Sequence, residues 1–101
     1  MSSKVQQGDV LKIERIRHPV LIVSTNFFNE SGEVTGCPIY EAGTESPLHI
    51  AVTADGMQGY VQCEKLALLD LRVRGHKKTG RITLKELMNI TDAIQGIFDY
   101  V

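Results

Sequence analysis

Short alternations of apolar and polar residues fill the first two thirds of the chain, the pattern of half-buried β-strands. Apolar and charged positions alternate at residues 10–14, and a polar turn follows at residues 15–18. The β-branched run at residues 19–24 predicts a central strand. Further strands are expected at residues 35–40, 48–53, 60–63 and 71–73, the last continuing the ambiguous segment 65–71.

Polar, glycine-rich stretches separate these strands. Turns or loops are expected at residues 26–32, 42–47 and 55–59, where Asn, Asp, Ser, Pro and Gly gather. Phe27 and Phe28 lie inside the first of these stretches, and we expect them to pack in a lid or an interface.

The last segment predicts an amphipathic α-helix that ends the chain. Thr83 and Glu86 have the spacing of a capping box. Apolar or small residues then recur every three or four positions on one expected face: Leu84, Leu87, Met88, Thr91, Ile94, Ile97 and Phe98. Gly96 is expected to weaken the helix by about 1 kcal/mol and to permit close packing. Several strands followed by one helix predict a mainly β fold, a small antiparallel barrel or curled sheet with the helix over one opening or edge.

Composition narrows the class of protein. The 101 residues are 43% hydrophobic and 23% charged, which predicts a single globular domain over residues 1–101. No apolar run reaches the ~18 residues of a membrane span, and the N-terminal residues lack the apolar region of a secretory signal. We therefore expect a cytoplasmic protein. Cys37 and Cys63 are expected to be reduced core thiols, and the sequence predicts no metal site and no cofactor.

Charge is nearly balanced overall, with a net charge of −1, but it is unevenly distributed. Residues 72–81 hold five of the 11 Lys and Arg residues and no acid. A second basic cluster contains Lys12, Arg15, Arg17 and His18 and is interrupted by Glu14. If the two clusters share a surface, that surface would attract phosphates, whereas the alternative is a solvated loop before the helix. The aromatic residues Tyr40, Tyr60, Phe27 and Phe28 are candidates for stacking on unpaired bases, with core packing as the alternative.

Seven segments in a fixed order carry a resemblance to a known family. They are Gly8–Leu11, His18–Ser24, Phe27–Asn29, Cys37–Ile39, Pro47–Val52, Gly59–Glu64 and Leu69–Gly75. In this order they resemble the MazF/PemK/Kid toxins of bacterial toxin–antitoxin pairs, and the resemblance covers residues 8–98. It implies a small SH3-like barrel of the PemK/CcdB type, a homodimer, and a cognate antitoxin as partner.

The resemblance also implies metal-independent cleavage of single-stranded RNA, in which a 2′-hydroxyl attacks the adjacent phosphorus and leaves a 2′,3′-cyclic phosphate. This chemistry needs a proton acceptor, a proton donor and a cation beside the phosphorane. Arg17, His18 and Asp70 are therefore the catalytic candidates. The candidates for substrate binding are Lys12, Arg15, Tyr40, Glu41, Lys65, Arg72, Lys77 and Lys78.

The sequence also departs from the family pattern. His18 stands where the family has an arginine before the second-strand proline, with Arg17 one residue earlier, and Tyr40 stands where it has a threonine. Ala67 replaces an arginine of some members, Asp70 is retained, and the first loop is short. These departures favour an alternative, a catalytically degenerate member that binds a protein such as a topoisomerase, or only its antitoxin. A weaker alternative is a small SH3-like adaptor without toxicity.

Overall fold

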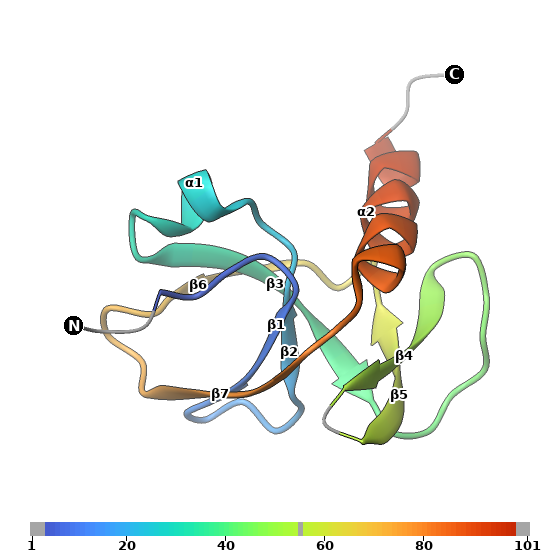
Figure 1. Ribbon diagram of the computed structural model, residues 1–101, viewed down its shortest axis with the longest axis horizontal. Coiled ribbons are helices and arrows are strands. Elements are labelled where there is room, and N and C mark those ends of the chain that lie inside the picture. Colours follow the sequence, from blue (N-terminus) through green and yellow to red (C-terminus); the bar gives the residue numbers. More distant parts are fainter. Residues whose placement is uncertain (1–3, 55, 99–101) are drawn as a thin grey trace.

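One long strand organises the computed structural model, which describes residues 4–54 and 56–98 (Figure 1). This strand, β3, spans Glu33–Tyr40. The other described elements are β1 (Asp9–Ile13), β2 (Val20–Ile22), α1 (Asn26–Asn29), β4 (His49–Ala54), β5 (Met57–Gln62), β6 (Ala67–Asp70), β7 (His76–Arg81) and α2 (Leu84–Phe98). The expected mainly β fold with a C-terminal helix is confirmed.

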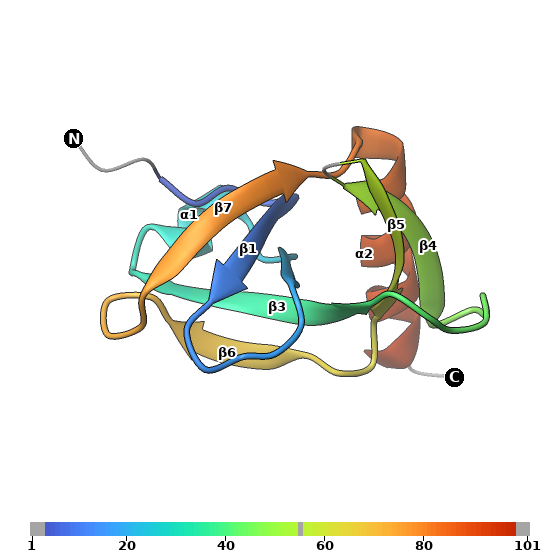
Figure 2. The ribbon, with the colours of Figure 1, turned by 90° about the horizontal axis from the view of Figure 1, so that it is seen from below.

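The strands form one curled antiparallel sheet. Its main path runs β4-β5-β3-β2-β1-β7, and β6 pairs with β3 off this path. The first half of β3 pairs with β6, from Glu33 opposite Asp70, and its last two residues pair with β5, with Tyr40 opposite Tyr60. The sheet bends where β3 changes its pairing from β6 to β5. Beyond this bend, β4 and β5 lie beside α2 (Figure 2).

Two apolar clusters fill the interior of the curled sheet. Val10 of β1 belongs to one cluster and the next residue, Leu11, belongs to the other, as the alternation of a strand requires. The first cluster also contains Ile90 of α2, which is fully buried. This contact fixes α2 against the sheet. None of the helices in residues 4–54 and 56–98 is long and apolar enough to cross a membrane.

The capping box of α2 is confirmed. Thr83 N donates to Glu86 Oε1 at 2.9 Å, and Glu86 N donates to Thr83 Oγ1 at 3.2 Å. The other carboxylate oxygen of Glu86 accepts a hydrogen bond from Thr53 N at 2.9 Å, which ties the start of the helix to β4. These bonds lower the pKa of Glu86 against the opposing effect of its burial.

The expected apolar face of α2 is only partly correct. Ile90, which lies outside the expected face, is the buried residue of the helix, and Leu87 and Ile94 pack partly buried against the same core cluster. Leu84, Met88 and Phe98 are instead 71%, 56% and 71% exposed. The helix is therefore rotated, so that its periodic apolar residues divide between the core and the surface. The expected close packing at Gly96 is wrong, because a Cβ at this position would meet nothing within 4 Å.

Three sequence expectations about local structure need correction. The strand expected at residues 71–73 is wrong, because β6 ends at Asp70 and its carboxylate accepts a hydrogen bond from Arg72 N at 2.9 Å, which turns the chain. The basic stretch that follows is not a loop, since His76–Arg81 form β7 along the edge of the sheet. The expected turn at residues 26–32 begins with the short helix α1, which Thr25 caps.

The hairpin between β4 and β5 turns more tightly than expected. Ala54 pairs with Met57, so β5 begins inside the stretch expected to be a turn. Gly56 takes a positive φ of 74°, and the expected turn residue Asp55 lies outside the described residues. The two cysteines are buried and free, and burial is the main cause that raises the pKa of Cys37 to about 12 and of Cys63 to about 11. Both thiols are therefore protonated near neutral pH.

A buried carboxylate at the start of β1 binds two cationic side chains of β7. Asp9 is only 1% exposed. Its Oδ1 accepts Arg81 Nη1 at 2.6 Å and Lys78 Nζ at 3.2 Å, and its Oδ2 accepts Gln6 N at 2.8 Å. Its two side-chain partners, Lys78 and Arg81, lie near the other end of the sequence, so Asp9 ties β1 to the edge strand β7.

Candidate functional site

The two basic clusters of the sequence lie on adjacent strands. In the antiparallel pair of β1 and β7, Lys12 is the direct partner of Lys77, and Leu11 is the partner of Lys78. Lys12 and Lys77 are both exposed, so two cations face solvent at neighbouring positions. We call Lys12, Arg15, Arg17 and Lys77 the basic ridge.

The β1–β2 turn joins this ridge to the start of β2. Ile16 N donates to Ile13 O at 3.0 Å, and Arg15 takes a positive φ of 67°, which makes the turn tight. Glu14 N donates to Gly75 O at 2.8 Å, so the turn is also bonded to the segment before β7. Arg15 and Arg17 are both exposed, and no ion pair found within residues 4–54 and 56–98 involves Arg17. Cationic groups of the turn are thus open to a ligand.

Three residues far apart in sequence meet beyond this turn. The ring of His18 lies 4.2 Å from the ring of Tyr40, centroid to centroid, at an interplanar angle of 55°. Lys65 Nζ donates to the hydroxyl of Tyr40 at 3.3 Å and lies 5.3 Å from the centre of its ring. Ile39 N donates to Pro19 O at 2.9 Å, which fixes the end of β3 against the residue after His18. We call His18, Tyr40 and Lys65 the His18 cluster.

A hydrogen-bonded pair of side chains stabilises the turn that carries Lys65. His49 Nε2 and Glu64 Oε2 are 3.0 Å apart, and Cys63 N donates to Leu48 O at 2.9 Å. The hydrogen bond from His49 lowers the pKa of Glu64 below its ordinary value. The pair thereby holds the end of β5 beside the start of β4, one residue before Lys65. Sequence reasoning missed this pair, since nothing in the spacing of His49 and Glu64 signals it.

Asp70 does not join the His18 cluster. Asp70 is opposite Glu33 at the first residue of β3, whereas Tyr40 is its last residue, roughly 23 Å away at about 3.3 Å per strand residue. Its two carboxylate oxygens accept Nε and Nη2 of Arg72, both at 2.9 Å. These bonds lower the pKa of Asp70. Within one copy of the chain, Asp70 orients Arg72 and not His18.

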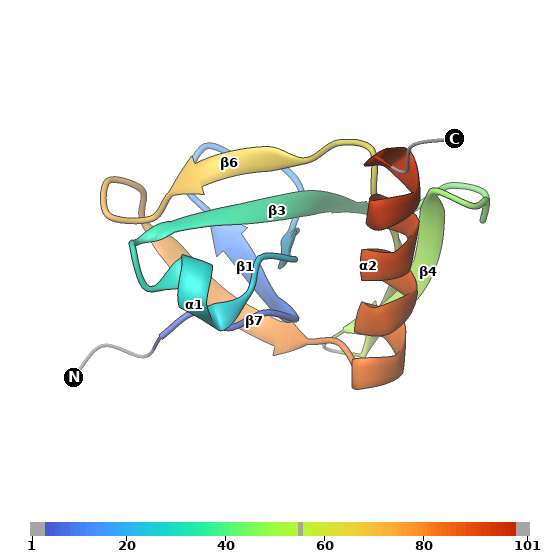
Figure 3. The same ribbon diagram turned by 90° about the horizontal axis from the view of Figure 1, so that it is seen from above.

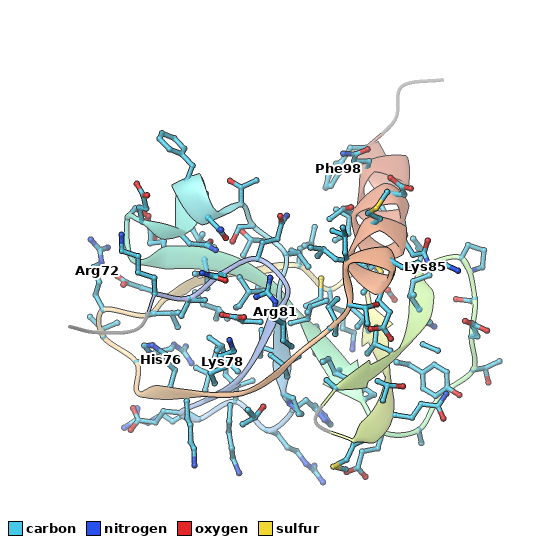
Figure 4. All side chains as sticks on the ribbon, in the orientation of Figure 1. Arg72, His76, Lys78, Arg81, Lys85 and Phe98 are labelled. Atoms are coloured by element: carbon cyan, nitrogen blue, oxygen red, sulfur yellow. The ribbon has the colours of Figure 1, made fainter. Side chains whose placement is uncertain are left out.

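The remaining candidates lie around the cluster and the ridge. Lys78 is paired with the buried Asp9, as described above, so its charge is partly neutralised. Glu41 is exposed in the loop that follows Tyr40. Figure 4 shows Lys78 and Arg81 close together beside β1, with Arg72 and His76 farther along the same side of the molecule. The structure therefore places Lys12 opposite Lys77, with Arg15 and Arg17 in the adjoining β1–β2 turn. Separately, it brings His18, Tyr40 and Lys65 together.

Two cavities formed by the described residues lie away from the His18 cluster. One of about 800 Å³ is lined by Val5, Asn26, Leu71, Arg72 and His76, among others, near the start of β3, at the opposite end of this strand from Tyr40. Its polar lining groups are largely bonded within the protein, since Arg72 binds Asp70 and His76 Nδ1 lies 3.0 Å from Arg74 O. The candidate site, with exposed cations around the half-buried His18 and Tyr40, lies outside both of these cavities.

The chemistry available at this surface is proton transfer beside cations. An imidazole can accept and return a proton near neutral pH, and Arg and Lys side chains bind phosphate oxygens. Among residues 4–54 and 56–98, no group of three or more His, Cys, Asp or Glu side chains is arranged to hold a metal ion. The residues present thus fit phosphate binding and acid–base chemistry on an exposed strand.

A curled antiparallel β-sheet followed by one C-terminal helix places this chain in the class of small SH3-like β-barrels. A sequence model of the family described as PemK-like, MazF-like toxin of type II toxin–antitoxin system matches residues 6–98. The chain belongs to this family. No curated protein matches the sequence.

Solved structures share the fold at low sequence identity. A chain in the MazE–MazF complex from Deinococcus radiodurans is 19% identical with a TM-score of 0.85, covering 96% of this chain and 98% of that chain. An endoribonuclease from a mycobacterial species is 22% identical with a TM-score of 0.82, covering 95% and 92%. The Mycobacterium tuberculosis toxin MazF-mt6 is 19% identical with a TM-score of 0.68, covering 83% and 88%. These likenesses establish the shared fold.

Proposed function

We propose that this toxin is a metal-independent endoribonuclease that cleaves single-stranded RNA. The observation that carries the proposal is the basic ridge on β1, β7 and their adjoining turn, directly before the His18 cluster. Cations on neighbouring strands follow a polyanion, and a histidine at their end supplies proton transfer. Membership of the toxin family supports the same activity.

Each group in the site has a role in this reaction. His18 takes the proton of the attacking 2′-hydroxyl, and Arg17 and Lys65 stabilise the charge of the phosphorane. The bond from phosphorus to the 5′-oxygen then breaks, and the 5′-oxygen takes a proton from water to leave as a hydroxyl. The hydroxide that remains takes the proton from His18, which returns to its neutral form. The products are a 2′,3′-cyclic phosphate and a 5′-hydroxyl end.

The other candidates hold the RNA. Lys12, Arg15 and Lys77 bind backbone phosphates, and Tyr40 stacks on a base beside the reacting phosphate. Glu41, exposed next to Tyr40, accepts hydrogen bonds from a base amino group. Lys78 and Arg72 bind RNA phosphates farther from the reacting step, and Asp70 orients Arg72.

A cleavage assay with excess chelator tests the proposal. Purified protein is incubated with a long single-stranded RNA and, in parallel, with the same sequence as a duplex. Cleavage of the single strand alone, undiminished by EDTA, is expected, because no step uses a metal. Intact single-stranded RNA at high protein concentration would overturn the nuclease assignment and favour the alternative of a protein-binding toxin. The replacement of the family's arginine and threonine by His18 and Tyr40 supports that alternative.

We further propose that the partner which controls this activity is an antitoxin. The Deinococcus radiodurans structure contains MazE with MazF, and a mycobacterial endoribonuclease was solved with its cognate antitoxin. An acidic segment of such a partner would be attracted to the basic ridge and would exclude RNA by occupying it.

A second copy of the chain is the proposed partner of the exposed apolar side of α2. Leu84, Met88 and Phe98 are exposed on this helix, and Phe27 of α1 is 85% exposed. Figure 3 shows α1 and α2 on the same side of β3, and a hollow of about 420 Å³ between them is lined by Phe28 and Ile94. Exposed apolar surface of this kind marks protein interfaces.

Light scattering is expected to give a particle of twice the 11.2 kDa chain mass. Met88→Glu places a charge in the apolar surface and is expected to shift the protein to monomer. Asn89→Glu, an exposed neighbour on another side of the helix, is the matched control and should remain dimeric. A wild-type protein that is monomeric at high concentration would contradict the proposed dimer.

A further inference from the structure

A row of three aromatic rings crosses the surface next to the basic ridge. Tyr40 of β3 and Tyr60 of β5 are direct partners in an antiparallel pair, so their side chains leave the same face of the sheet about 5 Å apart at Cβ. The ring of His18 continues the row on the other side of Tyr40, with 4.2 Å between the two ring centroids. We call His18, Tyr40 and Tyr60 the aromatic row.

The face that carries this row points away from the core. The residues that alternate with the row, Ile39 and Val61, are buried in the same core cluster as Ile90 of α2. Figure 2 shows α2 on one side of β4 and β5, so the rings leave on the opposite side. Gln58 and Gln62 lie two positions before and after Tyr60 on β5, and therefore share its face. The half-buried rings are thus flanked by amide groups that can pair with base edges.

The loop after β3 passes beside the Tyr60 ring at a glycine. A Cβ built at Gly43, in the loop after β3, would contact ring atoms of Tyr60 at 3.5 and 3.6 Å. Any longer side chain at this position would extend over or along the ring. Gly43 has no positive φ, so its backbone does not require glycine. A larger side chain at position 43 would therefore cover more of the Tyr60 ring than glycine does.

Cationic groups lie beside the row, and of the acidic groups near it Glu41, next to Tyr40, is exposed. Lys65 is bonded to the hydroxyl of Tyr40, and the ridge residue Arg17 directly precedes His18. Glu64, next to Lys65, is paired with His49. A flat aromatic surface with adjoining cations fits unpaired nucleobases joined by phosphates.

We propose that the aromatic row binds consecutive unpaired bases of RNA and leads the strand into the His18 cluster, with Tyr60 stacking on a base outside the reacting step. The proposal rests on the proposed RNA function and adds a base-binding subsite to it. Each base–aromatic stack contributes about 1–3 kcal/mol, which converts to about 5- to 150-fold in affinity.

Binding of a single-stranded RNA with 2′-O-methyl groups, which cannot be cleaved through the 2′-oxygen, tests this subsite by fluorescence anisotropy. Tyr60→Leu removes the aromatic face and Gly43→Leu covers it, and each is expected to weaken binding about tenfold. Tyr60→Phe keeps the face and should stay within about twofold of wild type. Gly96→Leu is the control for adding leucine at an open, exposed glycine, and it should also bind like wild type.

The dependence of affinity on salt separates stacking from charge. Tyr60→Leu should leave unchanged the slope of the logarithm of the binding constant against the logarithm of the salt concentration. Lys77→Ala should make this slope shallower by the amount that corresponds to about one phosphate contact. If the Tyr60→Leu and Gly43→Leu variants bind RNA like wild type while Lys77→Ala weakens binding, the proposed base-binding subsite is overturned and the proposed RNA function stands. If the wild-type protein binds no single-stranded RNA, both are overturned.

Discussion

Replacing His18 with alanine is expected to lower the rate of RNA cleavage by about 10²- to 10⁴-fold, because a positioned acid–base group contributes about that much. His18 is the one histidine held against Tyr40 at the end of the basic ridge, among the described residues. Affinity for uncleavable RNA should change by less than about tenfold, since the ridge cations remain. The loss should therefore appear in kcat and not in KM.

His76→Ala is the matched control for this substitution. His76 also lies in the basic region, but it is exposed and belongs to β7, where Ile13 is its partner. It should retain cleavage within a few-fold of wild type. Equal losses in His18→Ala and His76→Ala would mean that general basicity, and not proton transfer at His18, supports the reaction.

Replacing Asp9 with alanine is expected to lower the free energy of unfolding by about 3 kcal/mol, the lower end for breaking a buried ion pair. The buried carboxylate accepts hydrogen bonds from Arg81 and from Gln6 N and forms an ion pair with Lys78, and all three interactions are lost together. For a domain of about 100 residues this corresponds to a fall in Tm of about 12–24 °C. Thermal unfolding followed by circular dichroism measures it.

Lys78→Met tests whether burial of the carboxylate is what matters. The Lys78 side chain is 52% exposed, so its pair with Asp9 is screened by water, and its removal should change stability by less than about 1 kcal/mol. Asp9→Ala and Lys78→Met variants of equal stability would contradict the role assigned to the buried carboxylate.

The alternation of apolar and polar residues predicted most of the fold, because a strand that buries one face has apolar residues at every second position. Residues such as Leu11 and Ile13 are buried as their alternation indicates. The pattern failed at β7, whose residues His76–Arg81 are almost all polar. This strand lies at the sheet edge and forms through its pairing with β1, so its side chains need not be apolar. It also failed for α2, where contact with β4 and β5 selects Ile90 as the buried residue.

The candidate site followed from sequence only in part. Segregation of charge was visible, but only the register of β1 with β7 sets Lys12 opposite Lys77. Likewise, more than twenty residues separate His18 from Tyr40 and Tyr40 from Lys65. Only the fold brings the His18 ring against Tyr40 and the Lys65 ammonium to the Tyr40 hydroxyl. Asp70 was retained from the family pattern, and its position at the other end of β3 follows from pairing that no local motif encodes.

The chemical identity of the new RNA ends tests the central account most directly. A single-stranded RNA cleaved in EDTA is analysed by mass spectrometry, next to the same RNA carrying a 2′-deoxynucleotide at the cleaved position. Attack by the 2′-hydroxyl beside His18 gives a 2′,3′-cyclic phosphate and a 5′-hydroxyl, and the deoxy substitution should block cleavage at that position. Ends that carry a 3′-hydroxyl and a 5′-phosphate, or unimpeded cleavage of the deoxy substrate, would contradict it.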